Sequence, residues 1–142
     1  MPGAVSCFSV TLSMSGAQAF SGTAVVPNQQ GCQTVLAQNA SSNASEVSLG
    51  AALSGTDGSA VTLSVILDHY SGPGDYTQAN NDVYIEILAG DSEFKPQFSA
   101  ASTTITASAQ PDGSVSITFS DLGDATGQQN VSGKAVFTCE NA

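Results

Sequence analysis

The sequence is poor in charge and contains neither tryptophan nor arginine. Only 10% of its 142 residues are charged, against about 25% in an average soluble domain. The sequence has two basic residues, Lys95 and Lys134, and twelve acidic residues, so the formal net charge is -10. Such a surface repels phosphate backbones and anionic headgroups, which argues against nucleic acid and anionic lipid as partners.

Long hydrophobic runs are missing as well. No stretch approaches the roughly 18 apolar residues of a membrane-spanning helix. The opening MPGAVSC has neither the basic region nor the apolar core of a secretion signal. The uncharged polar positions are filled by Ser, Thr, Asn and Gln, a profile typical of secreted and cell-surface β proteins. We therefore expect one domain over residues 1–142, located outside the cytoplasm, either secreted or in the cell envelope.

Strict alternation of apolar and polar residues is the dominant pattern. Period two indicates strands with one buried face. The alternating apolar sets are Phe8, Val10, Leu12 and Met14; Val47, Leu49, Ala51 and Leu53; Val61, Leu63, Val65 and Leu67; Val83, Ile85 and Ile87; and Val115, Ile117 and Phe119. Weaker strands fit residues 18–26, 32–38, 103–109 and 131–139.

Eight or nine short strands without a helical period predict an all-β fold, either an antiparallel sandwich or a barrel. The inward residues are mostly Val, Leu and Ile without a wide-cavity pattern, so we favour a β-sandwich of immunoglobulin-like or related topology. The turn sequence QPDGS at 110–114 predicts a hairpin between the strands that flank it. Residues 89–102 break the alternation and carry Phe94 and Phe98, which fits either core packing or a binding loop.

Three cysteines allow one disulfide and leave one thiol. Their spacing lacks CxxC pairs, which argues against a zinc site. Cys32 opens the apolar run CQTVL and Cys139 closes the strand AVFTC, so the first choice for the bridge is Cys32–Cys139. Cys7 falls out of phase with the apolar residues around it and is expected to be free or intermolecular.

Several segments resemble the small exported lipoproteins of actinobacteria, with the mycobacterial 19 kDa lipoprotein antigen family as the best-known example. The resembling segments are SGTAVV at 21–26 followed by Cys32, the SLGAAL strand, DGSVSITFSDL, and the closing VSGKAVFTC. The resemblance implies a compact β-sandwich tethered outside the cell, a disulfide from an early strand to the last one, and no established catalysis. The sequence AVSC at 4–7 lacks the apolar stretch that precedes a lipidation site.

The single histidine lies in LDHYSGPGDY, next to a predicted turn. Asp68 adjoins His69 in a strand and therefore points to the opposite face, so these two do not form a dyad. Asp75 reaches His69 only across the SGPG turn. No GxSxG motif supplies a nucleophile. We expect a tight turn with Tyr70 and Tyr76 packed at its rim, and no enzyme activity.

Two kinds of ligand site remain as alternatives. Asp and Gly-rich turns supply the oxygens that Ca²⁺ prefers, and the candidate metal ligands are Asp57, Asp82, Asp121 and Asp124. Aromatic side chains bind sugar rings, and Tyr84 shares its predicted outer face with Glu86, so Tyr84 and Tyr76 are the candidate platform. His69 and Asp75 complete the candidate ligand-binding set.

The leading functional prediction is a non-enzymatic envelope or surface protein that acts in recognition or architecture, with protein or carbohydrate partners at the cell surface. The first alternative is a sugar-binding or lipid-binding module, with or without Ca²⁺. The second is a filament or coat subunit, in which residues 1–15 add a strand to a neighbour and self-association involves Cys7 or the edge strands.

The charge imbalance gives a first testable prediction. Twelve acids repel one another across the folded surface, so added salt is expected to raise the free energy of unfolding by screening. Urea unfolding at about 0.01 M and about 0.15 M ionic strength, where the Debye length falls from about 30 Å to about 8 Å, measures the effect. Equal free energies at the two ionic strengths would contradict it.

Overall fold

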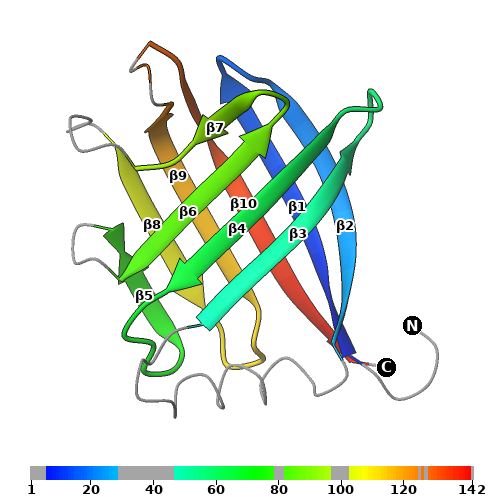
Figure 1. The fold of residues 1–142 in the computed structure, drawn as a ribbon. Helices are drawn as coiled ribbons and strands as arrows, with labels where there is room; N and C mark the ends of the chain where they lie inside the picture. The colour runs from blue at the N-terminus through cyan, green and yellow to red at the C-terminus, as the bar shows by residue number, and fades with distance from the viewer. Residues whose placement is uncertain are drawn as a thin grey trace.

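The computed structural model describes residues 6–28, 47–78, 82–96, 103–124, 126 and 128–141. The described residues form ten strands (Figure 1), which are β1 (Ser6–Gly16), β2 (Phe20–Asn28), β3 (Val47–Gly55), β4 (Ala60–Leu67), β5 (Gly74–Thr77), β6 (Val83–Ala89), β7 (Ser92–Phe94), β8 (Thr104–Ala109), β9 (Val115–Gly123) and β10 (Asn130–Asn141). The prediction of an all-β, antiparallel fold is confirmed. Within these ranges no helix is long and apolar enough to cross a membrane.

All ten strands belong to one sheet, in the order β5-β8-β9-β10-β1-β2-β3-β4-β6-β7. The sheet curls into a half-barrel that wraps around its own core (Figure 1). The two-sheet sandwich expected from the sequence is therefore replaced by a single curled sheet. Alternation could not separate the two, because a curled sheet and a sandwich both bury every second residue.

The inner face of the sheet carries the predicted apolar residues. Burial alternates along β3 and β4 as the two-residue period requires. Val10, Leu63 and Ile117 are completely buried. Most outward positions of β1, β8 and β9 are occupied by Ser or Thr. Exposed examples are Thr11, Ser13, Thr104, Thr106 and Thr118.

The predicted strand ranges agree with the structure in most places. The predicted strand 18–26 lies at Phe20–Asn28, and the alternating residues Val61 to Leu67 lie in β4, which ends at Leu67. The predicted strand 32–38 lies outside the described residues. Element boundaries shift by a few residues because the turns, and not the alternation, decide where pairing stops.

The hairpin at QPDGS is confirmed. The backbone N–H of Gln110 donates to the carbonyl of Ser114 at 2.8 Å, and the N–H of Gly113 donates back to Gln110 at 3.0 Å. Gly113 has a φ of 92°, which only glycine adopts without strain. The carboxylate of Asp112 accepts the N–H of Ser114 at 2.9 Å, and this hydrogen bond lowers the pKa of Asp112.

The irregular stretch after β6 packs against the core. Its first part forms β7, which pairs with β6 through Ile87 and Phe94. Phe94 is 0% exposed. Beyond β7 the N–H of Lys95 donates to the carbonyl of Gly123 at 3.0 Å, which ties this end of the sheet to β9. Phe94 therefore belongs to the core, which confirms the core-packing alternative for this residue. Phe98 lies outside the described residues.

The first strand sits in the middle of the sheet, which corrects its predicted role as a donor strand. Residues 6–16 pair with β10 on one side and with β2 on the other. A strand with both edges paired has no edge to offer a neighbouring molecule. The two edge strands are β5 and β7, with four and three residues. Such short edges limit pairing with other chains.

Candidate functional site

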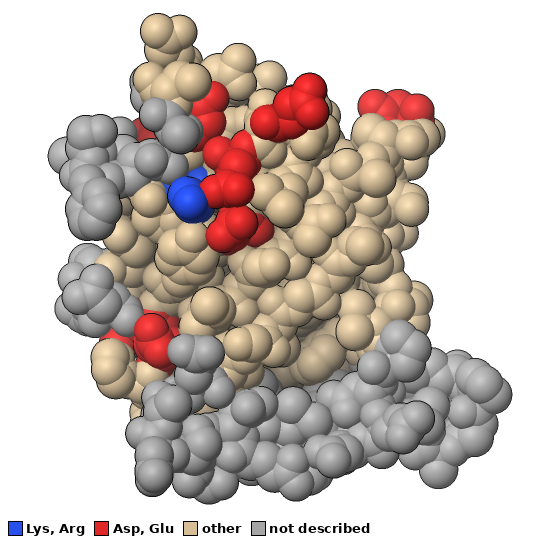
Figure 2. Space-filling model, viewed as in Figure 1, with Lys and Arg blue, Asp and Glu red and all other residues tan. Residues whose placement is uncertain are grey.

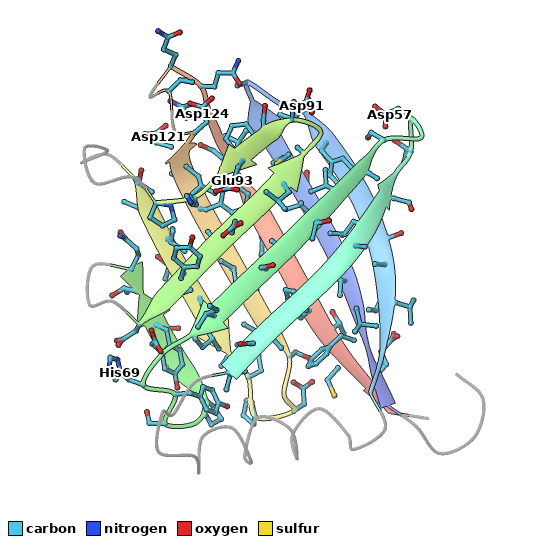
Figure 3. All side chains as sticks on the ribbon, in the orientation of Figure 1. Asp57, His69, Asp91, Glu93, Asp121 and Asp124 are labelled. Atoms are coloured by element: carbon cyan, nitrogen blue, oxygen red, sulfur yellow. The ribbon has the colours of Figure 1, made fainter. Side chains whose placement is uncertain are left out.

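The predicted site residues are spread over separate regions of the sheet (Figure 3). His69 lies at one end of the strands, whereas Asp57, Asp121 and Asp124 lie at the opposite end. Tyr84 and Glu86 occupy outward positions of β6, between these two ends. The structure therefore brings together pairs of the predicted residues and no single site that contains them all.

His69 pairs with Asp82 and not with Asp75. Its Nδ1 lies 3.0 Å from Oδ1 of Asp82. The backbone of His69 is left-handed, with a φ of 54°, and this turns the side chain toward the segment before β6. The imidazole is 72% exposed. Asp75, which the sequence offered as a neighbour of His69 across the SGPG turn, lies in β5 opposite Ser108, and the carboxylate in contact with His69 is that of Asp82.

The His69–Asp82 contact is expected to contribute little to folding. Exposed pairs of this kind are worth about 0–1 kcal/mol. We expect His69→Asn to lower the free energy of unfolding by less than about 1 kcal/mol, because asparagine also tolerates a positive φ. Urea unfolding at neutral pH measures it. A loss of several kcal/mol would show that the imidazole is a structural element of this end of the sheet.

Tyr76 is buried and cannot serve as an exposed sugar platform, which corrects that part of the prediction. Its ring stacks on Tyr70 with a centroid distance of 5.6 Å and an interplanar angle of 19°. The Tyr76 hydroxyl accepts the N–H of Ser71 at 3.1 Å and donates to the carbonyl of Gly72. Burial, and next the proximity of Tyr76, raise the pKa of Tyr70. The two rings hold the SGPG turn, and their packing at its rim is confirmed.

The four predicted calcium ligands do not form a cluster. The carboxylate of Asp57 accepts both the hydroxyl and the N–H of Ser59, and these hydrogen bonds lower the pKa of Asp57. The carboxylate of Asp124 accepts the hydroxyl of Thr126 at 2.6 Å. At Asp121, which has a φ of 52°, the backbone carbonyl accepts the hydroxyl of Thr103. Ordinary turn hydrogen bonds thus account for Asp57 and Asp124.

Calcium binding stays a prediction. Among the described residues there is no group of three or more His, Cys, Asp or Glu side chains that could hold a metal ion. An ion bound only by the native state must raise the thermal midpoint. Melting curves in EDTA and in excess CaCl₂ test the prediction, and superimposable curves would count against a calcium site.

A mixed polar and apolar patch covers the outer face of β6 and β7. We call it the Tyr84 surface, and it consists of Tyr84, Glu86, Leu88, Glu93 and Lys95. Leu88 lies opposite Glu93 in the pairing of the two strands and is 40% exposed. Acidic side chains gather in this region beside a basic one (Figure 2).

Two polar contacts organise the Tyr84 surface. The hydroxyl of Tyr84 donates to Oε2 of Glu86 at 3.2 Å. The Nζ of Lys95 lies 2.7 Å from Oε1 of Glu93, and this contact raises the pKa of Lys95. Burial, followed by the hydrogen bond and negative charge of Glu86, raises the pKa of Tyr84, while Lys95 opposes the shift. At neutral pH the phenol is therefore protonated and acts as a donor.

Sequence reasoning found Tyr84 and Glu86 but missed the other members of this patch. Glu93 and Lys95 come from the segment that was expected to be irregular. Only the pairing of β7 with β6 places Glu93 beside Leu88. A period-two pattern three residues long is too short to detect, so cross-strand neighbours on β7 could not be predicted.

The predicted Cys32–Cys139 bridge has one end in the described structure. Cys139 lies in β10 opposite Phe8 of β1 and packs against the edge of the core. In the same register Cys7 lies opposite Glu140. Cys32 itself lies outside the described residues, and the bridge stays a prediction.

Comparison with known proteins gives no match to a family model, to a curated protein or to a solved structure.

Proposed function

We propose that the protein is a non-enzymatic domain that works outside the cytoplasm in recognition or architecture, and that the Tyr84 surface is its recognition surface. The composition supports an extracytoplasmic location, since uncharged hydroxyl and amide side chains replace most charged ones. The resemblance to exported actinobacterial lipoproteins agrees with this location and with a function that does not involve catalysis.

The contrast between the Tyr84 surface and its surroundings carries this proposal. Outward positions of β1, β8 and β9 are small hydroxyl residues, for example Thr11, Thr106 and Thr118. The Tyr84 surface instead combines an aromatic ring, an exposed leucine and charges of both signs on β6, on β7 and on Lys95 directly after β7. Aromatic residues are enriched where proteins bind partners, whereas isolated hydroxyls are common on any surface.

The arrangement around the single histidine supports the non-enzymatic part of the proposal. General acid-base catalysis needs a positioned and usually shielded imidazole beside a reacting group. His69 is largely exposed, and the side chain in contact with it is Asp82. Its geometry is that of a surface pair that joins two segments.

Site-specific photocrosslinking on living cells of the source organism tests the proposal. Benzoylphenylalanine replaces Leu88 in one variant and Thr118, an exposed residue of β9, in the control variant. We expect a discrete crosslinked product on the cell exterior from position 88 and none from position 118. No product from position 88, or equal products from both positions, would contradict a recognition role for the Tyr84 surface.

A further inference from the structure

Tyr84 occupies an outward position of β6 and is half-buried. Residues two apart on a strand face are separated by about 6.6 Å, and the Tyr84 hydroxyl reaches the carboxylate of Glu86 two positions ahead. The phenol therefore lies on the outer face of β6 beside Glu86, and Ile66 of β4 is the cross-strand neighbour of Tyr84.

Two carboxylates lie near Tyr84 on the β6–β7 hairpin. Glu86 accepts a hydrogen bond from the Tyr84 hydroxyl, and the charge of Glu93 on β7 also acts on Tyr84. Lys95 is the basic residue of the patch and forms an ion pair with Glu93. An aromatic ring is itself negative on its face, so ring and carboxylates attract the same kind of group. The patch has the sign of the whole chain, whose formal charge is -10.

We propose that the Tyr84 surface binds an arginine side chain on an exposed segment of a partner protein, with the guanidinium stacked on Tyr84 and hydrogen-bonded to Glu86. This inference rests on the proposed recognition function of the surface and specifies the chemistry of its partner. Guanidinium is the group of choice because it is planar, stacks on aromatic faces and donates two parallel hydrogen bonds to a carboxylate. Leu88 contacts the apolar part of the partner segment.

The partner is a different protein and not a second copy of this chain. The sequence contains no arginine, and both copies of a dimer would carry the same large negative charge. Like charges across an interface oppose association. The absence of arginine also means that the chain has no guanidinium of its own with which to occupy the Tyr84 surface.

The first measurement is an NMR titration with the acetylated and amidated peptide Gly-Arg-Gly-Arg-Gly. The control peptide carries citrulline, a neutral analogue of nearly the same shape, in place of each arginine. We expect the arginine peptide to shift the signals of Tyr84, Glu86 and Leu88 and its own side-chain methylene protons to move upfield through the ring current. We expect citrulline to produce neither change, and raising the salt to about 0.5 M to weaken the arginine effect.

Variants separate ring stacking from general charge attraction. We expect Tyr84→Thr to weaken binding about two- to fivefold, because an exposed cation–π contact is lost, whereas Tyr84→Phe retains the ring and most of the affinity. Thr118→Ala, on another part of the outer face, is the matched control. A thermal melt confirms that each variant is folded.

Three results would overturn the arginine proposal. These are equal binding of the citrulline peptide, unchanged affinity in folded Tyr84→Thr, and a neutral N-acetylglucosamine oligomer that shifts the same signals when the arginine peptide does not. In the last case the Tyr84 surface binds a sugar. A product from position 88 in the crosslinking experiment, together with no arginine binding, would leave the recognition function standing and remove only the arginine partner.

Discussion

Replacing Phe94 with alanine is expected to lower the free energy of unfolding by about 3–5 kcal/mol, the usual cost of removing a buried phenylalanine. Phe94 belongs to a three-residue edge strand, where a side chain would ordinarily contribute little. It is nevertheless completely buried and among the largest side chains of the core. Chemical denaturation measures the loss.

Leu88→Ala is the matched control for Phe94→Ala. Leu88 lies on the adjacent strand and points outward, so its truncation is expected to change the free energy of unfolding by no more than about 0.5 kcal/mol. Similar small effects for both variants would mean that β7 does not seal the core, and that the stretch after β6 is a surface loop.

A second large effect is expected at Gly133, where one added methyl group meets the backbone of β1. A Cβ at this position would lie 2.7 Å from Cα of Met14 and closer still to the carbonyl oxygen of Ser13. The pairing of β10 with β9 is irregular between Val131 and Gly133, and on the other side of β10 Gly133 pairs with Met14 of β1. We expect Gly133→Ala to lower the free energy of unfolding by about 2–3 kcal/mol, since backbone cannot move aside as a side chain can.

Gly50→Ala is expected to have the opposite effect on the free energy of unfolding. Gly50 is an outward residue of β3, and its added Cβ would lie 3.4 Å from the carbonyl oxygen of Leu63, an acceptable contact. Alanine in the interior of a strand is favoured over glycine by about 0.5–1 kcal/mol, so this variant is expected to be slightly more stable. Thermal melts of the two variants side by side test the pair. Equal thermal midpoints for Gly133→Ala and Gly50→Ala would show that β1 leaves room for a side chain at position 133.

The strands and the inward residues could be predicted from the sequence because period two is a local signal. Val61 to Leu67 alternate in the sequence and alternate in burial in the structure. The hairpin at Gln110–Ser114 could also be predicted, because Pro111 and Gly113 have fixed backbone preferences. Each of these features depends on residues close together in the chain.

The arrangement of the sheet could not be predicted in the same way. Whether two layers form or one sheet curls depends on which strands are neighbours, and β1 pairs with the far end of the chain. The site shows the same limit. Tyr84 and Glu86 share a strand and could be predicted together, whereas Glu93 joins them only through cross-strand pairing. His69 contacts Asp82 from a backbone conformation with positive φ, which could not be predicted from the residues around it.

The central position of β1 has a consequence for how the chain folds. Ser6 pairs with Asn141, so the contacts that complete the middle of the sheet join the first described residue to the last. Contacts between such distant residues slow folding. Until β10 is available, β1 exposes a long unpaired edge rich in alternating apolar residues, which is a template for aggregation. Self-association is therefore expected to compete with folding until β10 is available to pair with β1.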